Sequence, residues 1–187
     1  MQEIKNRMLP LKEATSIKHR QAEKMPFNMR MIEGLLSKEE YVLYLNQQLQ
    51  IFKAMEKRGV PHDSLKRAER IEQDIAELNA QKIYSDTILN STQEYVNYLN
   101  ALSDEDLLAH NYLNYLALMF GGQITKKSVP STGKMYDFEN MQEGMMSVRK
   151  VQKDEWADEV NKGFDFNIQL FDELESACKK LESTSNK

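Results

Sequence analysis

Histidine is the residue type in this chain that is best suited to hold a metal, and it occurs three times: His19, His62 and His110. His19 shares one side of an expected helix with three residues at steps of three or four: Leu11, Thr15 and Ala22. Basic residues flank it: Lys12, Lys18 and Arg20. A histidine that faces a bundle interior, with cations nearby for acidic groups, can ligate a haem iron. The same spacing also fits a half-buried histidine in a polar helix.

Two adjacent glycines, Gly121 and Gly122, end the aromatic and apolar segment Y-L-N-Y-L-A-L-M-F. Because glycine has no β-carbon, such a pair lets a flat ligand approach the backbone or lets the helix kink. A simple helix C-terminus is the alternative, since glycine is preferred there.

Asn167 interrupts an apolar stripe that runs from Phe164 to Phe171 near the C-terminus. A buried amide needs partners, such as an ordered water or a ligand, whereas an edge position would need none. Asp106 and His110 stand one helical turn apart and are expected to pair, although two groups alone make a poor metal site.

Several common site types are missing. No Glu stands three residues before a His, so the Glu-x-x-His signature of di-iron bundles is absent, as is His-Glu-x-x-His. The glycine pair lacks the phosphate-loop and dinucleotide patterns, and no nucleophile elbow is present. The single cysteine, Cys178, excludes an internal disulfide and a cysteine-based metal cluster.

The composition predicts one all-α domain over residues 1–187. Glycines number 7 and prolines 4, so helix breakers are few. The formal net charge of −4 argues against nucleic-acid binding through net basicity. The N-terminus shows no signal peptide, and the longest apolar run, 115–120, is too short to span a membrane. We therefore expect a soluble, cytoplasmic protein.

The helices are expected at residues 3–23, 28–36, 38–57, 64–82, 92–100, 104–120, 138–152 and 155–182, packed as a bundle, with the main loop at 126–137. Ser37 with Glu40, and Ser91 with Glu94, fit the capping box, in which side chain and backbone satisfy each other's unpaired groups. Ser103 gives a weaker version of the same pattern, and Asp63 or Ser64 is expected to cap the helix after Pro61.

Taken together, three separated motifs resemble those of the haem oxygenases. L-K-E-A-T-S-I-K-H-R-Q-A-E (11–23) resembles the family's proximal helix, A-H-N-Y-L-N-Y-L-A-L-M-F-G-G-Q-I-T-K-K (109–127) its distal helix, and F-D-F-N-I-Q-L-F-D-E-L-E (164–175) its final helix. The resemblance covers most of the chain in the right order. It implies an all-α haem oxygenase fold and haem as both substrate and cofactor.

The resemblance also implies roles, position by position. His19 would be the axial iron ligand, with Thr15 and Glu23 beside it. Gly121 and Gly122 would lie over the distal face of the haem. The remaining implied haem-binding positions are the propionate contacts Lys12, Tyr112 and Arg149 (with Lys150 and Lys153 as alternatives to Arg149), the ring contacts Phe164 and Phe171, and Asn167.

The distal helix departs from the family pattern. Leu118 stands where a carboxylate usually orders distal water, Asn114 replaces a usual Arg, and Phe52 replaces a usual Tyr. Asn167 does match. The ordinary water network is therefore largely lost, and an arrangement through Asn167 and backbone carbonyls is one substitute.

Three hypotheses follow. The first is a haem oxygenase that cleaves haem to biliverdin, ferrous iron and carbon monoxide, with O2 and electrons from an external donor such as a ferredoxin or a reductase. The second is a haem-binding protein without cleavage, which the changes at Leu118, Phe52 and Asn114 favour. The third is the same bundle without haem. The presence of His19, Lys12 and Tyr112 together argues against it. A monomer is the default expectation.

Overall fold

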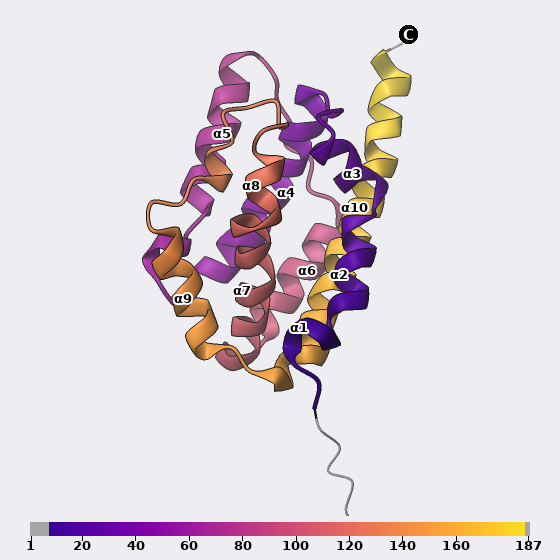
Figure 1. Cartoon of the computed structure of the whole chain (residues 1–187). Helices are drawn as coiled ribbons and strands as arrows, with labels where there is room; N and C mark the ends of the chain where they lie inside the picture. The colour runs from indigo at the N-terminus through magenta and orange to yellow at the C-terminus, as the bar shows by residue number, and fades with distance from the viewer. Residues whose placement is uncertain (1–7, 186–187) are drawn as a thin grey trace, which may run out of the picture.

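The computed structural model describes residues 8–185, and this part of the chain is helical with no strand. The main helices are α1 (Leu11–Ala14), α2 (Ser16–Glu23), α3 (Pro26–Ile32), α4 (Lys38–Glu56), α5 (Ala68–Ala80), α6 (Asn90–Ala101), α7 (Asp104–Met119), α8 (Gly121–Thr125), α9 (Met141–Val151) and α10 (Ala157–Ser185). Short 3-10 turns lie at Asp63–Leu65, Lys134–Tyr136 and Asp154–Trp156. Figure 1 shows the helices packed as one bundle, which confirms the predicted all-α class.

Helix α4 forms the centre of the bundle because it is apolar on most of its circumference. It packs against α5, α6, α7 and α10, and most of its residues between Glu40 and Met55 are buried. The predicted capping box at its start is confirmed: the Ser37 hydroxyl accepts from the Glu40 amide, and the Glu40 carboxylate accepts from the Ser37 amide.

Two other predicted caps are wrong: neither Ser91 nor Asp63 or Ser64 caps a helix with its side chain. The carboxylate of Glu173 and the imidazole of His62 accept from the backbone amides there instead. Helix α6 begins at Asn90 and not at Ser91, and Glu173 of α10 accepts from both of their backbone amides. After Pro61, the imidazole of His62 accepts from the Ser64 amide at the start of the 3-10 turn. Helix α5 starts only at Ala68, where the Glu56 carboxylate accepts from the backbone amide. Ser103 does cap α7, as expected.

The first helix is shorter than predicted and is divided. Residues 3–7 lie outside the described part, and Met8, Leu9 and Pro10 are not helical. Thr15 separates α1 from α2, and its hydroxyl donates to the carbonyl of Leu11 at 2.9 Å. The hydroxyl therefore satisfies the backbone at the break.

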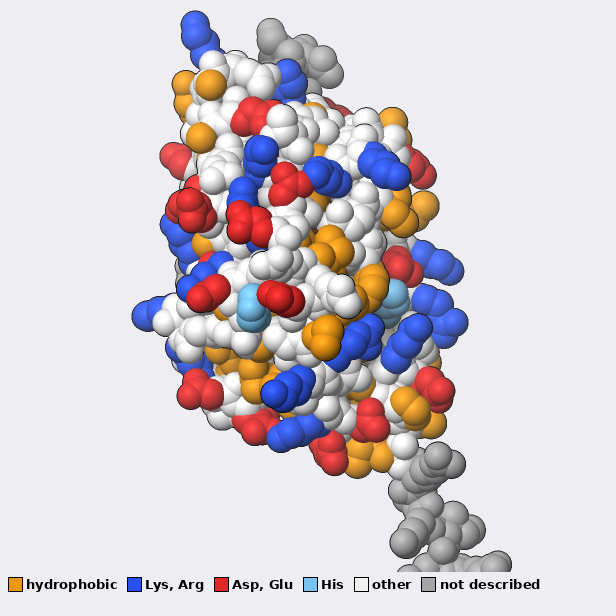
Figure 2. Space-filling model, turned by 60° about the vertical axis from the view of Figure 1, so that its left-hand side comes forward, with side chains coloured by type: hydrophobic (Ala, Val, Ile, Leu, Met, Phe, Trp, Pro, Cys, Tyr) orange, Lys and Arg blue, Asp and Glu red, His pale blue; other side chains and the backbone are white. Residues whose placement is uncertain are grey.

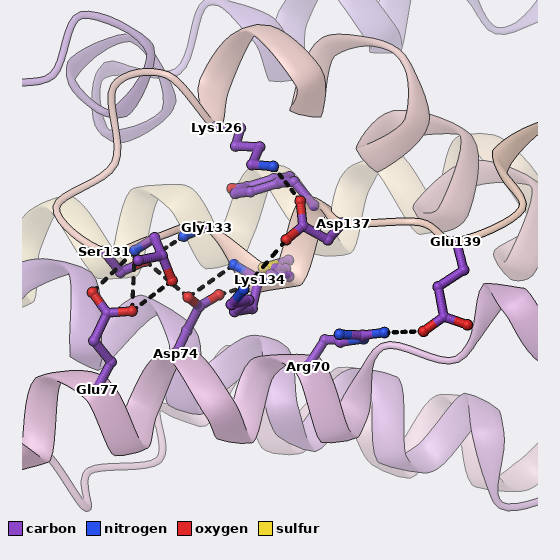
Figure 3. A network of polar contacts seen from close by, with 12 residues as sticks. Arg70, Asp74, Glu77, Lys126, Ser131, Gly133, Lys134, Asp137 and Glu139 are labelled. Atoms are coloured by element: carbon purple, nitrogen blue, oxygen red, sulfur yellow. Dashed lines mark hydrogen bonds and ion pairs between the residues drawn. The ribbon is translucent and has the colours of Figure 1, made fainter.

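The connection from α8 to α9 is held against α5 by carboxylates (Figure 3). Asp74 is fully buried and accepts from the Ser131 hydroxyl at 3.0 Å and from the amides of Lys134 and Met135 at 2.9 and 2.8 Å. Lys126 pairs with Asp137 across the base of the loop. The end of α8 is thereby fixed to the bundle.

Helices α7 and α10 cross closely where α10 carries Gly163. A β-carbon added there would lie 2.6 Å from Leu113 Cδ2 and 3.1 Å from His110 Nδ1, both on α7. Leu113 is buried in a small apolar cluster with Leu11, Trp156 and Phe164, so its side chain has little room to move. The absence of a side chain at Gly163 therefore sets the distance between these two helices.

Gly163→Ala is expected to lower the free energy of unfolding by about 1–3 kcal/mol, because the added methyl overpacks this crossing. Urea unfolding followed by circular dichroism measures the change. Gly121→Ala is the matched control, since nothing lies within 4 Å of its added β-carbon and alanine favours a helix. Equal losses at both positions would contradict this account of the crossing.

Candidate functional site

His19 lies on α2 with its side chain 57% exposed. Of the two placements that the spacing allowed, the structure agrees with the histidine at the edge and not with the one that faces the bundle interior: Leu11, Thr15 and Ala22 are buried, whereas His19 is exposed. The break at Thr15 separates α1, with Leu11, from α2, with His19, so the spacing of one continuous helix does not apply across it. The His19 ring lies 5.6 Å from the ring of Phe164 on α10, and its Nε2 is 3.3 Å from Glu23 Oε1.

An exposed position suits a metal-ligating histidine better than a buried position would. Glu23 lies beside the Nε2 atom of the ring, and Phe164 lies beside the ring itself. His19 is therefore an accessible imidazole at the molecular surface, with a carboxylate and an aromatic ring next to it.

The helix opposite is interrupted at Phe120, where α7 ends and α8 begins. Its φ of −101° and ψ of −88° leave the helical range. The side chain of Gln123 donates to the carbonyls of Leu118 at 3.1 Å and Tyr136 at 2.9 Å, which stabilises the break. Four exposed residues form an apolar stripe that continues from α7 across this break into α8: Ala117, Phe120, Gly121 and Ile124.

The two adjacent glycines have different roles. A β-carbon on Gly121 would meet open space, whereas one on Gly122 would lie 2.8 Å from a ring carbon of Tyr136. Gly122 is therefore required by packing of the protein itself. Gly121 leaves the surface of the distal helix flat, which is the property that a planar ligand needs.

Helix α10 forms the floor between these two elements, because it packs against both α2 and α7. Phe164 contacts the His19 ring, and Asn167 donates to the Asn114 side chain of α7 at 3.4 Å. Phe171 is turned toward Phe27, with ring centroids 6.2 Å apart. We use the name slot for this set of residues: His19, the stripe from Ala117 to Ile124, and the face of α10 that carries Phe164 and Asn167.

Figure 2 shows apolar side chains gathered between the two histidines visible on one face, with lysine and arginine side chains around them. The guanidinium carbon of Arg149 lies 5.8 Å from the centre of the Phe120 ring. Burial raises the pKa of Tyr112, and the nearby Arg149 acts in the opposite direction.

The candidate anion-binding residues differ in what they contact. Arg149 makes no ion pair with any described residue, and it lies close to the slot through Phe120 and Tyr112. Lys153 is paired with Glu105 on α7. Lys12 is exposed on α1. Arg149 is therefore better placed than Lys153 to bind an acidic group at the slot.

The family model described as heme oxygenase matches residues 6–173 of this sequence. The chain belongs to the haem oxygenase family. It is 27% identical to the heme oxygenase of Guillardia theta, over 94% of this chain and 89% of that protein. It is 26% identical to heme oxygenase 2 of Macaca fascicularis over 91% of this chain, and it spans about two thirds (66%) of the length of that relative.

Solved structures share the fold. The structure of heme oxygenase-1 from Synechocystis in complex with heme aligns with a TM-score of 0.73 at 23% identity, over 95% of this chain and 97% of that one. The heme oxygenase of Leptospira interrogans gives a TM-score of 0.75 at 22% identity, over 87% and 97% of the two chains.

In this member of the haem oxygenase family, the three residues that depart from the family pattern are all buried. Leu118 is 7% exposed and Phe52 is 1% exposed, both within the main apolar core. Phe52 packs edge-on against Tyr115 with ring centroids 5.2 Å apart. Asn114 is 8% exposed and fully hydrogen-bonded. These three positions thus supply two apolar side chains and one neutral amide, and Asn111 on the same helix is a second buried amide.

The predicted pairing of His110 with Asp106 is wrong, because α10 supplies a better partner. His110 Nε2 lies 2.9 Å from Glu159 Oε1, and Nδ1 lies 2.7 Å from the Tyr95 hydroxyl. Sequence spacing along one helix gives no signal for contacts that arise where α6, α7 and α10 meet. No group of three or more His, Cys, Asp or Glu side chains in residues 8–185 is arranged to hold a metal ion.

A cavity of about 500 Å³ lies elsewhere, between the start of α4, residues 84–89 and the C-terminal half of α10. None of the predicted site residues lines it. It is therefore separate from the slot.

The buried imidazole predicts a pH dependence of stability. Burial lowers the pKa of His110 below its ordinary value of 6.5, despite the opposing effect of Glu159. Protonation therefore favours the unfolded chain, whose histidine has the ordinary pKa. The stabilisation is present above pH 6.5 and is lost as the pH falls through the pKa of the folded state.

The free energy of unfolding should accordingly decrease between pH 7.5 and 5.5, measured by urea titration at each pH. His110→Gln should flatten this slope, whatever it does to stability at pH 7.5. His62→Gln, at a partly exposed histidine, serves as the control and should keep the slope. An unchanged slope in His110→Gln would rule out His110 as its origin.

Proposed function

We propose that this protein is a haem oxygenase, which cleaves haem to biliverdin, ferrous iron and carbon monoxide with O2 and electrons from an external donor. The observation that carries the proposal is the pair of features that α10 brings together: an accessible imidazole at His19 on α2, beside Phe164 of α10, and an open surface at Gly121, next to α7, which packs on the same α10. Family membership and a structural relative described as a heme complex support the same ligand.

The residues of the slot fit a haem in distinct ways. His19 would hold the iron through an imidazole nitrogen, with the Glu23 carboxylate beside the ring. The apolar stripe from Ala117 to Ile124 would cover one face of the macrocycle and exclude water. Bound haem supplies the iron that activates O2 and the ring carbon that is oxidised. Arg149, Tyr112 and Lys12 would bind the propionates at the edge of the slot.

The protein's own part in the reaction is positioning. A neutral imidazole is a weaker electron donor than a thiolate, which disfavours early cleavage of the O–O bond and suits hydroxylation of the ring itself. The stripe lies against the distal side and limits where a bound oxidant can reach. No flavin or iron–sulfur motif is present in the sequence, so a ferredoxin or a reductase is proposed as electron donor. Among residues 8–185, no helix could cross a membrane.

A non-catalytic haem-binding protein is the second candidate, and one observation favours it. Leu118 and Phe52 are buried in the apolar core, so neither supplies a polar group to order water beside the haem. Such a protein would bind haem at the same slot and return it intact. We further propose a cytoplasmic monomer for either function.

Mixing the purified protein with hemin tests binding. A saturable one-to-one complex is expected, and its axial-ligand absorption spectrum should be lost in His19→Ala. The matched control is His62→Ala, which should keep the spectrum. Absence of saturable binding by the wild-type chain would exclude both candidates.

Aerobic turnover then separates the two candidates. With a reductase system and O2, the Soret band of the complex should disappear as biliverdin forms, identified by chromatography. A complex that stays spectroscopically stable under these conditions would establish the binding protein.

Filling the slot gives a graded prediction. Gly121→Leu should weaken hemin affinity at least about tenfold, because a single extra methylene in a fitted pocket already changes discrimination between ligands by about tenfold or more. Gly121→Ala should weaken it less. Both variants should unfold at the wild-type urea concentration or higher, since the added atoms meet no neighbour. Unchanged hemin affinity in Gly121→Leu would place the haem elsewhere.

A further inference from the structure

The segment that links α5 to α6 is held against α4 through its backbone. Asn46 Nδ2 of α4 donates to the carbonyl of Ser85 at 2.7 Å. Gln47 Nε2 donates to the carbonyl of Thr87 at 2.8 Å, and Gln47 Oε1 accepts from the Leu89 amide at 2.9 Å. Contacts at every second residue have the period of a β-strand, in which the N–H and C=O of one residue point to the same side. Two amide side chains of α4 therefore replace a neighbouring strand.

The opposite edge of this segment is unpaired. It belongs to the alternate residues Tyr84, Asp86 and Ile88, whose backbone N–H and C=O groups make no hydrogen bond with any residue from 8 to 185. All three residues are exposed. An extended peptide can add a strand to such an edge, because the main-chain hydrogen bonds form with any side chains. We call these three residues the open edge.

The cavity of about 500 Å³ lies directly beside the open edge, and Tyr84 and Asp86 form part of its wall. Its volume is within the range of about 300–1,000 Å³ that is typical of ligand pockets. Its apolar lining comes from the segment itself, from α4 and from α10: Leu43, Leu89, Ala177 and Leu181. Because side chains alternate along a strand, a peptide paired with the open edge would place every second side chain on the side of the cavity.

The charged residues that line the cavity are mostly acidic. They are three carboxylates and one ammonium group: Glu39, Asp86, Glu173 and Lys180. Glu173 already accepts from the first two amides of α6. Glu39 and Asp86 are exposed and make no ion pair with any described residue. These two carboxylates favour a partner that carries cations and repel one that carries anions.

We propose that the open edge and this cavity form a docking site for an extended peptide segment of a partner protein, in which apolar side chains alternate with lysine or arginine. The peptide backbone pairs with Tyr84, Asp86 and Ile88. Its apolar side chains enter the cavity, and its cations contact Glu39 and Asp86. The site shares no residue with the slot, so this inference is independent of the proposed function.

A partner protein fits this site better than a second copy of this chain. Two copies that paired through the open edge about a twofold axis would bring two Asp86 side chains close together, and like charges on adjacent strands are destabilising. The formal net charge of −4 on each copy acts in the same direction. A basic segment has neither cost.

Nuclear magnetic resonance of the whole chain tests the site with a synthetic probe, a blocked heptapeptide that alternates valine and lysine. The probe should bind saturably and shift the backbone amide signals of Tyr84, Asp86 and Ile88 the most. The same peptide with glutamate in place of lysine should bind at least about tenfold more weakly, because its charges face Glu39 and Asp86. A probe that is N-methylated on the residues facing the edge lacks the pairing donors, so it should also lose at least about tenfold.

Two variants separate main-chain pairing from charge. Ile88→Pro removes one N–H of the open edge, and proline is tolerated in extended edge segments, so the valine–lysine probe should bind about tenfold more weakly to a chain that keeps its circular dichroism spectrum. Asp86→Lys should weaken the valine–lysine probe and strengthen the valine–glutamate probe. Glu69→Lys is the matched control: it makes the same charge change at an exposed residue of α5 outside the cavity, and both affinities should stay at the wild-type value.

Three results would overturn the proposal. One is the absence of saturable binding of the valine–lysine probe at about 1 mM. The second is an N-methylated probe that binds as tightly as the unmodified one, which would leave side-chain binding without strand addition. The third is a wild-type dimer in sedimentation that becomes a monomer in Ile88→Pro, because the occupant would then be a second copy. All of these measurements are made without hemin, so they are decided separately from the function of the slot.

Discussion

The close crossing of α7 and α10 is the contact on which the site depends. Gly163 lets α10 approach the side chains of Leu113 and His110 on α7, so these two helices form a rigid unit. Helix α2 packs on the same α10, which fixes His19 relative to the distal helix although α2 and α7 share little direct contact. The position of His19 relative to α7 is therefore set indirectly, by two helix pairs that have α10 in common. Because interiors are close-packed, a change at this crossing is transmitted to the slot.

Much of the fold could be predicted from the sequence, because long apolar periodic segments determine helices through local physics. Helix α4 lies where its capping box and apolar pattern place it. The errors concentrate at helix ends, where a residue distant in sequence supplies the cap: Glu173 does so for α6. Such partners become neighbours only after the bundle has formed, so no local pattern indicates them. The break at Thr15 differs, since its contact is local: both the amide and the hydroxyl of Thr15 donate to the carbonyl of Leu11.

The glycine pair and His19, the two parts of the candidate site, could be predicted from the sequence to different degrees. The glycine pair pointed to a special surface, but only the packed structure shows that Gly121 is open while Gly122 is required by Tyr136. The spacing along α2 left open whether His19 faces the interior or lies half-buried at an edge, and the structure places the imidazole at an edge. The break at Thr15 and the packing of α2 on α10 decide this, and neither can be read from residue spacing. The partners of His110 come from α6 and α10 and could not be read from α7 alone.

The distribution of charge around the distal helix follows from the cost of burying ions. An ionised carboxylate among Phe52, Leu118 and Tyr115 would lose its hydration without a cationic partner, and the chain has no Arg at Asn114 to supply one. Glu159 instead lies at the surface end of α10, where its side chain is 14% exposed and Lys162 is close. The buried groups that it meets are neutral: His110 contacts Glu159 through Nε2 and the Tyr95 hydroxyl through Nδ1, and Asn114 donates to the Tyr95 oxygen. The ionised side chain therefore remains near water, while the polar groups between α6, α7 and α10 pair with one another without a buried charge.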